Sequence, residues 1–257
     1  MQLIIAEKPS VARTLADTVG AVVKHDGYLE GAGYLVSWCI GHLINLAEPD
    51  AYAERYTHWR YEDLPMIPKD WRYTVVNATK DQYAVLQKLM HDPRVDGIIC
   101  ATDAGREGEL IFRLVYEQAK CKLPVKRLWI SSLEQTAIRN GLCQMKDSSA
   151  YDNLYRAAVC RERADWLVGM NCTRLFSLLY GQTLKVGRVM TPTLSMIVRR
   201  EEAVRTFKPE HFYTVQISTG FISTSDRFST REEAEQLMND CMRQSIVVRH
   251  IERKEKM

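Results

Sequence analysis

A loop between two apolar segments constrains the fold of this chain most strongly. Residues 100–109 read CATDAGREGE; a short apolar strand pattern precedes them, and apolar residues recur at helical spacing after them. In open α/β sheets, strand-to-helix turns at the carboxyl ends of parallel strands carry the ligand site. The loop places three carboxylates, Asp103, Glu107 and Glu109, beside a helix N-terminus, which suits a hard divalent cation such as Mg2+.

Asp103 has a simpler interpretation as the N-cap of that helix. A capping box requires Glu or Gln three residues after the cap, where this chain has Arg106. Three acids, one Arg and two Gly within residues 103–109 exceed what a cap requires. The pattern therefore favours a functional loop.

A second strand–loop–helix unit opens the chain. Residues 3–6 form an apolar strand pattern, Glu7 and Lys8 follow it, and a helix pattern comes next. If the two strands are neighbours, Glu7 and Asp103 meet at one edge of the sheet, with Glu107 and Lys8 close by. Like charges so close require a cation or raised pKa values. Taken alone, Glu7 and Lys8 also fit an exposed loop pair.

The alternation of strand and helix patterns continues to residue 142 and predicts an α/β fold, a parallel sheet with helices on its faces. His42 follows a strand, where a structural role is common, although its ordinary pKa of about 6.5 leaves proton transfer or phosphate contact open. The other predicted strands are 34–40, 71–76, 95–101 and 125–130, and the helices are 80–91 and 133–142, the last one capped by Ser131 and Ser132.

The chain becomes helical after a polar break at 146–150, our first domain boundary. Over 151–180 we expect two helices with a bend near Gly169. Arg161 and Asp165 are four residues apart and so share a helix face, where an ordinary surface ion pair is the alternative.

A short helix and a β-rich region are expected next. Thr191 is the expected N-cap of a helix over 194–203, and a helix N-terminus with Arg188 nearby can hold a phosphate. The remaining predicted elements are strands over 211–217, 220–224 and 246–251 and a helix over 231–242.

Charge is unevenly distributed along the chain. The overall net charge is only +3, but residues 156–205 hold nine basic and four acidic side chains, a net of +5. Such a stretch can attract a polyanion, and a solvated helical face is the alternative. Aromatic residues interleaved with basic ones over 49–71 can stack on bases, but packing of a loop onto a core is the favoured interpretation.

Composition indicates a soluble cytoplasmic protein. No apolar run approaches the roughly 20 residues of a membrane span. The N-terminus lacks the basic and apolar regions of a signal peptide. The seven Cys form no CxxC pair, which argues against a zinc site and favours a reducing compartment.

Five motifs in order resemble the N-terminal part of bacterial type IA DNA topoisomerases, most closely the topoisomerase III kind. The resemblance covers nearly the whole chain, and its specificity lies in the order and spacing of the motifs. They are Ala6–Ser10 (AEKPS), Gly41–Leu43 (GHL), Ala101–Glu109 (ATDAGREGE), Arg161–Arg174 with DWLVGMN, and Gly187–Leu194 (GRVMTPTL).

The resemblance implies a Toprim domain with a Rossmann-like parallel sheet over 1–148, a helical DNA-groove domain over 149–207 and the start of a β-rich arch over 208–257. It implies that Glu7, Asp103 and Glu107 bind Mg2+ and that Lys8 and Arg188 contact the scissile phosphate of single-stranded DNA. Further DNA contacts are implied for His42, Arg106, Arg161, Asp165, Arg174 and Thr191.

The sequence departs from the family in two places. The family's Toprim motif often reads Asp-x-Asp, but the second position here is Gly105, so we expect one metal ion or weaker binding. Where family members often have Gln after Gly-Arg-Val, this chain has Met190. A polar contact to DNA is expected to be lost there.

The implied activity is cleavage and religation of one DNA strand through a 5′-phosphotyrosine, with relaxation or decatenation as the result. No tyrosine motif resembling Tyr-x-Arg-Thr-Asp-Ser occurs here, so we expect a truncated and by itself inactive fragment. No GxxxxGK[ST] loop is present either, which agrees with ATP independence. We also expect a monomer. The alternatives are another Toprim enzyme, a nuclease or primase, and a DNA-binding fragment without chemistry.

Overall fold

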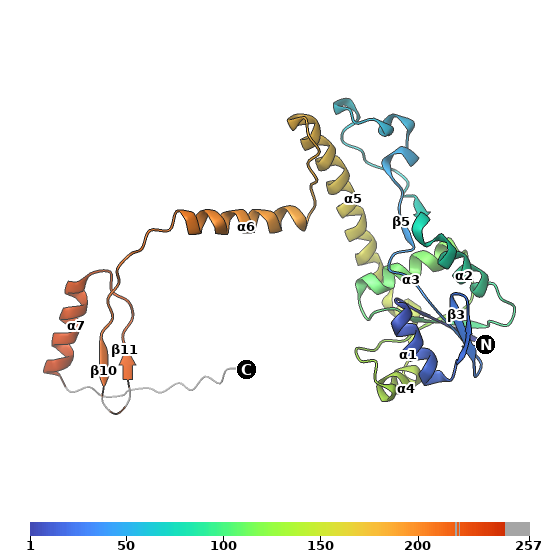
Figure 1. The fold of residues 1–257 in the computed structure, drawn as a ribbon, viewed down its shortest axis with the longest axis horizontal. Coiled ribbons are helices and arrows are strands. Elements are labelled where there is room, and N and C mark those ends of the chain that lie inside the picture. Colours follow the sequence, from blue (N-terminus) through green and yellow to red (C-terminus); the bar gives the residue numbers. More distant parts are fainter. Residues whose placement is uncertain (219, 221, 245–257) are drawn as a thin grey trace. The chain divides into compact units, whose positions relative to one another are not determined.

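The computed structural model describes residues 1–218, 220 and 222–244 in two compact units, 1–193 and 194–257 (Figure 1). The division falls within helix α6 (Met190–Arg205). The predicted division into 1–148, 149–207 and 208–257 stays a prediction.

The first unit is built on a seven-stranded sheet with the order β2-β3-β4-β1-β7-β8-β9. Strands β4, β1, β7 and β8 are parallel to one another, while β2, β3 and β9 pair in antiparallel fashion. The strands that precede Glu7 and Asp103 are neighbours, which was the condition for these two residues to meet. Ala6 of β1 lies opposite Ala101 of β7. The strands are β1 Gln2–Ala6, β2 Val23–His25, β3 Tyr28–Gly31, β4 Tyr34–Trp38, β7 Gly97–Ala101, β8 Val125–Arg127 and β9 Lys146–Asp147.

Helices cover both faces of this sheet, which is why residues 3–6 of β1 and all of β7 are apolar rather than alternating. Leu3 and Ile5 of β1 pack into a core with α2 (Lys80–Met90) and α3 (Arg106–Gln118). Ile4 and Ala6 pack into a second core with α1 (Pro9–Val19) and α4 (Gln135–Cys143). The two cores fix both strands, and hence the loops at their carboxyl ends.

Two predictions for the central sheet and the helix beside it are wrong. The strand predicted at 71–76 does not join the central sheet: β6 (Tyr73–Val75) pairs instead with β5 (Ile44–Leu46) in a separate two-stranded sheet. The predicted cap at 131–132 is also displaced, since α4 starts at Gln135.

Helix α5 (Asp152–Tyr180) is one continuous helix, so the predicted bend near Gly169 is wrong. The following segment packs alongside it: Val186 N donates to Thr173 Oγ1 at 2.9 Å. The glycine that ends the helix is Gly181, whose φ of 67° is in the left-handed region.

The aromatic segment packs against α5, as the favoured interpretation predicted (Figure 1). The rings of Tyr52 and Trp71 each lie edge-on to Trp166 at 5.6 Å. Trp166 is buried, and its Nε1 donates to Ala47 O at 3.0 Å. The segment itself contains short 3-10 helices, η1 (Pro49–Ala51), η2 (Glu54–Thr57) and η3 (Tyr61–Asp63); η4 (Asn77–Thr79) and η5 (Ser148–Tyr151) occur later.

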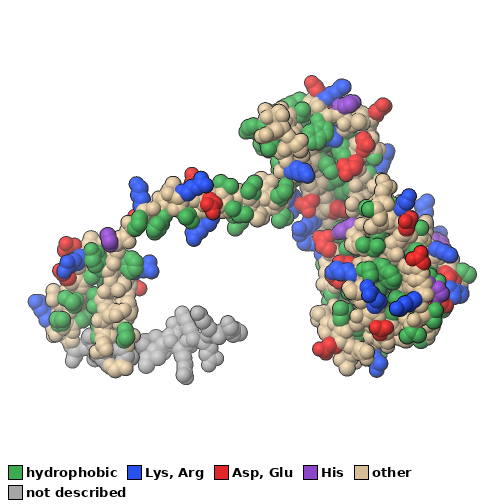
Figure 2. Space-filling view, viewed as in Figure 1, with side chains coloured by type: hydrophobic (Ala, Val, Ile, Leu, Met, Phe, Trp, Pro, Cys, Tyr) green, Lys and Arg blue, Asp and Glu red, His purple; other side chains and the backbone are tan. Residues whose placement is uncertain are grey.

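Helix α6 starts earlier than predicted. Thr191 lies inside it rather than at its N-cap, and Thr191 Oγ1 accepts a hydrogen bond from Gly187 N at 3.1 Å. No residue of α6 is buried, and Figure 2 shows hydrophobic side chains along its length. Among the described helices, none is both long and apolar enough to cross a membrane.

The second unit contains a hairpin of β10 (Gln216–Ser218) and β11 (Ile222–Thr224), followed by α7 (Arg231–Arg243). The predicted helix over 231–242 is confirmed. Its N-cap Thr230 accepts a hydrogen bond from Glu233 N at 3.4 Å. The predicted strand over 246–251 lies outside the described residues.

The continuity of α5 predicts that Gly169→Ala stabilises the chain. Alanine costs about 1 kcal/mol less than glycine inside a helix. The added Cβ would lie 3.7 Å from Val186 O, an ordinary contact. Urea denaturation should show a rise in unfolding free energy. The control is Gly20→Ala, which should destabilise because the φ of Gly20 is +82°. Destabilisation by Gly169→Ala would contradict the continuous helix.

Candidate functional site

Glu7, Lys8 and Asp103 meet at the carboxyl ends of β1 and β7. Asp103 N donates a hydrogen bond to Glu7 Oε2 at 3.2 Å. Lys8 Nζ lies 2.9 Å from Asp103 Oδ2 and 3.7 Å from Glu7 Oε1. The hydrogen bond to Asp103, followed by the charges of Asp103 and Glu7, raises the pKa of Lys8 above its ordinary value. The residues expected to meet are therefore in contact.

Asp103 is not the helix cap. The N-cap position of α3 is Gly105, and no side chain caps this helix. The Asp103 carboxylate instead accepts from Lys8. The capping interpretation is thus excluded, and the carboxylate remains half-exposed at the mouth of the loop.

Glu107 lies in the first turn of α3 and faces two basic side chains. Its Oε2 is 4.0 Å from His42 Nε2, and its Oε1 is 3.8 Å from Arg106 Nε. His42 and Arg106 are therefore beside Glu107, as supporting residues of the same site would be. Within the part of the chain that the structure describes, no three His, Cys, Asp or Glu side chains converge on one point.

The donor set nevertheless fits a cation. Glu7 and Asp103 already hold one, the ammonium group of Lys8, which stands in for an ion between their carboxylates. Oxygen atoms of carboxylates are the ligands that Mg2+ prefers. Glu7 and Asp103 could therefore hold such an ion, while Glu107, the third predicted ligand, contacts His42 and Arg106 in this structure.

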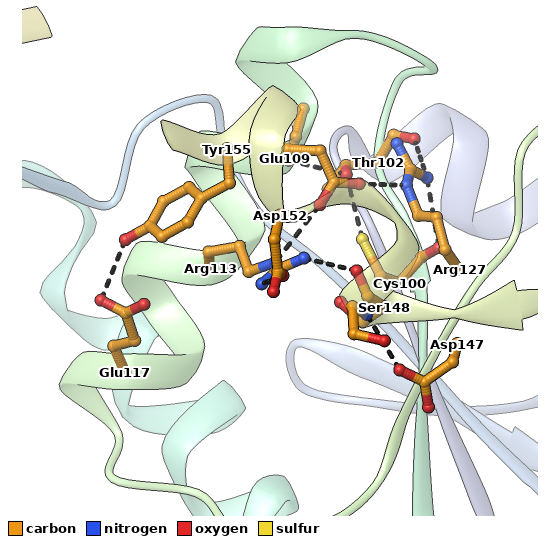
Figure 3. Close-up of polar contacts among 12 residues, drawn as sticks. Cys100, Thr102, Glu109, Arg113, Glu117, Arg127, Asp147, Ser148, Asp152 and Tyr155 are labelled. Atoms are coloured by element: carbon orange, nitrogen blue, oxygen red, sulfur yellow. Dashed lines mark hydrogen bonds and ion pairs between the residues drawn. The ribbon is translucent and has the colours of Figure 1, made fainter. Parts of the chain in front are cut away.

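A buried arginine holds the loop from beneath, and sequence reasoning missed it (Figure 3). Arg127 of β8 and Glu109 of α3 are both fully buried, with 2.5 Å between Arg127 Nε and Glu109 Oε1. Arg127 Nη1 donates to Thr102 O at 2.7 Å, and its Nη2 donates to Asp103 O at 2.8 Å. Arg127 Nη1 also donates to the carbonyl oxygens of Cys100 and Leu128.

Glu109 therefore belongs to the interior, not to the exposed carboxylate cluster that the loop sequence indicated. Its second oxygen is 3.3 Å from Arg113 Nε, and Arg113 Nη1 lies 2.8 Å from Asp152 Oδ1 at the start of α5. The signal in the sequence was an Arg inside the apolar pattern Val125–Ile130, where a buried charge requires an acidic partner.

A second polar cluster lies on α5. Asp165 is between two arginines, with Arg161 Nε 3.5 Å from Oδ2 and Arg188 Nη1 3.3 Å from Oδ1. All three side chains are about two-fifths exposed, at 40–42%. The ion pair at 161 and 165 is thus present but extends to Arg188, so it presents two guanidinium groups to solvent rather than one neutral pair.

Arg174 lies apart from these exposed groups. It is 7% exposed, its guanidinium lies 5.5 Å from the centre of the Trp59 ring, and burial lowers its pKa. Its surroundings favour a packing role, and its predicted contact with DNA stays a prediction.

Comparisons with known proteins find two family profiles. Residues 2–133 match the Toprim domain, and residues 149–257 match a profile described as DNA topoisomerase. Two curated relatives are named DNA topoisomerase 3. The Staphylococcus epidermidis protein is 44% identical over 237 residues, 91% of this chain and 33% of its own length. The Staphylococcus aureus (strain MRSA252) protein is 42% identical over 242 residues, 93% of this chain and 34% of its own length.

The chain thus spans about a third of the length of these relatives. Among solved structures, full-length topoisomerase I from Thermotoga maritima matches with a TM-score of 0.57 at 20% identity, over 91% of this chain and 37% of the other. At this identity the likeness supports the fold alone.

The close contact of Gly108 with the loop predicts that Gly108→Ala impairs the site. A Cβ at this position would lie 2.1 Å from Asp103 O, so the backbone of the loop must shift. We expect a loss of about 1–3 kcal/mol in unfolding free energy, as for overpacking, and weaker Mg2+ binding by calorimetry. Gly105→Ala is the matched control, because nothing lies within 4 Å of its Cβ position. Equal Mg2+ affinity in both variants would contradict the prediction.

Removal of the buried arginine should be more costly. Arg127→Met leaves the Glu109 carboxylate buried beside Arg113 alone, and breaking a buried ion pair costs about 3–5 kcal/mol. Urea denaturation measures the loss. The double variant Arg127→Met/Glu109→Met should recover part of it, since no unpaired carboxylate remains. A single variant within 1 kcal/mol of wild type would show that the pair does not hold the loop.

Proposed function

Because the chain belongs to the type IA DNA topoisomerase family, with a Toprim domain at its N-terminus, we propose that it carries the metal- and DNA-binding part of an enzyme that cleaves and religates one DNA strand. The observation that supports this most directly is the meeting of Glu7, Lys8 and Asp103 at the ends of two neighbouring parallel strands. Ligand sites of open α/β sheets lie at such strand ends.

The proposed reaction is a transesterification at one phosphodiester. A tyrosine hydroxyl, which the longer relatives would supply, attacks phosphorus and gives up its proton to a base, the bond from phosphorus to the 3′ oxygen breaks, and the 3′ oxygen takes up a proton. Religation reverses these steps, and the bond energy kept in the phosphotyrosine removes the need for ATP. An acid of the site would exchange the proton with the 3′ oxygen.

Lys8 and Arg188 supply positive charge to the reacting phosphate in this proposal. Preorganised cations at the site of developing charge are a large contribution to phosphoryl-type catalysis. Glu7, Asp103 and Glu107 would hold Mg2+, which adds further positive charge when bound. The match to the Toprim domain supports a metal cofactor in general. That the metal is Mg2+ is part of the proposal. So is the binding of one ion rather than two, since Gly105 replaces a possible ligand.

The strand would lie along the exposed face of α5. Arg161 and Arg188 offer charge-assisted hydrogen bonds to phosphates, and Asp165 between them keeps both guanidinium groups in place. Single-stranded DNA is the proposed partner, with His42 and Arg106 near the cleaved bond and Thr191 near Arg188. A monomeric state, a cytoplasmic location and independence of nucleotide cofactors complete the proposal.

A DNA-binding role without chemistry is the second candidate. It is favoured by the exposed guanidinium groups of Arg161 and Arg188 beside Asp165, which suit phosphates but carry out no reaction themselves. A Toprim nuclease or primase fits less well, because it leaves the Arg161–Asp165–Arg188 cluster unexplained.

Binding of single-stranded DNA tests the proposal. Fluorescence anisotropy with a labelled oligonucleotide should show affinity that falls steeply with salt. Loss of one phosphate contact in Arg188→Ala should weaken binding and reduce the slope of log K against log[salt] by about 0.7. Arg139→Ala, an exposed arginine of α4, is the control and should bind as wild type. No binding at low salt, or equal slopes in both variants, would contradict the proposed groove.

A further inference from the structure

The ammonium group of Lys8 occupies the position between the two carboxylates that would hold a metal. It lies 2.9 Å from Asp103 and 3.7 Å from Glu7, and its side chain is 54% exposed. These two acids are its partners in the described structure, so no buried contact keeps the Lys8 side chain in place. Its backbone, in contrast, is fixed at the N-cap of α1, where Lys8 O accepts from Ala12 N at 3.0 Å.

The carboxylates themselves are anchored independently of Lys8. Asp103 donates its backbone N–H to Glu7 Oε2, and its carbonyl oxygen accepts from the buried Arg127. Departure of the lysine would therefore leave Glu7 and Asp103 close together with two uncompensated charges. That arrangement is unfavourable unless another cation enters.

We propose that Lys8 is the internal counter-ion of the metal-free site, and that a divalent cation entering between Glu7 and Asp103 displaces its ammonium group, which then becomes available to a DNA phosphate. The inference rests on the proposed function and deepens it. A divalent cation bound between Glu7 Oε1 and Asp103 Oδ2 would take the two oxygens that the Lys8 ammonium group contacts, and the two positive charges would repel each other.

The exchange couples two ligands. Metal binding frees the Lys8 ammonium group for phosphate, and phosphate contact with Lys8 vacates the carboxylates for metal. By linkage, each ligand raises the affinity for the other by the same factor. Lys8 would thus be a positioning residue for the metal and a direct contact for DNA.

Amine labelling of the whole chain with acetic anhydride, read by mass spectrometry, tests the exchange without requiring activity. The contacts of its ammonium group with Asp103 and Glu7 should make Lys8 slow to acetylate without metal. Saturating Mg2+ should increase its rate severalfold. Lys24, exposed on β2, is the internal control and should not change. Asp103→Asn should label fast at Lys8 with or without Mg2+.

Calorimetry on the same samples establishes Mg2+ saturation and separates the possible failures. Mg2+ binding with an unchanged or lower Lys8 rate overturns the exchange and leaves the proposed function standing. Absence of Mg2+ binding overturns both the exchange and the metal part of the proposed function. Addition of oligo(dT) to the Mg2+-bound chain should protect Lys8 again, and continued fast labelling would overturn its transfer to phosphate.

Discussion

The buried ion pair of Arg127 and Glu109 is the interaction on which the candidate site depends. Arg127 reaches from β8 across the end of β7 and binds the carbonyl oxygens of Thr102 and Asp103 (Figure 3). It therefore fixes the backbone from which the Asp103 carboxylate projects. Through Glu109, Arg113 and Asp152 the same chain of ion pairs continues into α5. One buried guanidinium group thus connects the loop, the helix that follows it and the helix that carries Arg161 and Asp165.

Two acids of the loop, Glu107 and Glu109, have different surroundings because their side chains point to opposite sides of α3. Glu107 is 54% exposed and Glu109 fully buried, although they are two residues apart on α3. The difference follows from helical geometry, since residues two apart point in directions that differ by about 200°. The buried acid stabilises the loop, and the exposed one lies at the surface beside His42 and Arg106. Asp103 makes both kinds of contact. Its backbone carbonyl oxygen accepts a hydrogen bond from the buried Arg127, and its exposed carboxylate accepts one from Lys8.

Sequence patterns predicted the strands that are buried on both faces of the sheet. Residues 3–6 of β1 and 97–101 of β7 were predicted as strands because they are apolar throughout, and the parallel pairing of the two strands brings Glu7 and Asp103 together. The burial of Arg127 was missed because two basic residues are adjacent in this strand. Lys126 and Arg127 point to opposite faces of the sheet, and the sequence does not show which of the two is buried. The end of α5 at Gly181 was expected, but the two helices expected on either side of Gly169 are one, because an isolated glycine weakens a helix without having to interrupt it. The pairing of β6 with β5 could not be read from the local sequence either, because it joins two strands that are distant along the chain.

Gly105 is the position where the family's second aspartate is missing. Its backbone is extended, with φ −178° and ψ 175°, and nothing lies within 4 Å of the place where a side chain would begin. Packing therefore does not exclude an acid there, and any L-amino acid can adopt that conformation. A single substitution at Gly105 could therefore add a negative charge to the loop. The backbone at Asp103 and in the first turn of α3 is held by the buried pair of Arg127 and Glu109. In evolutionary terms, the number of acids at this site can change without any change in the architecture that presents them.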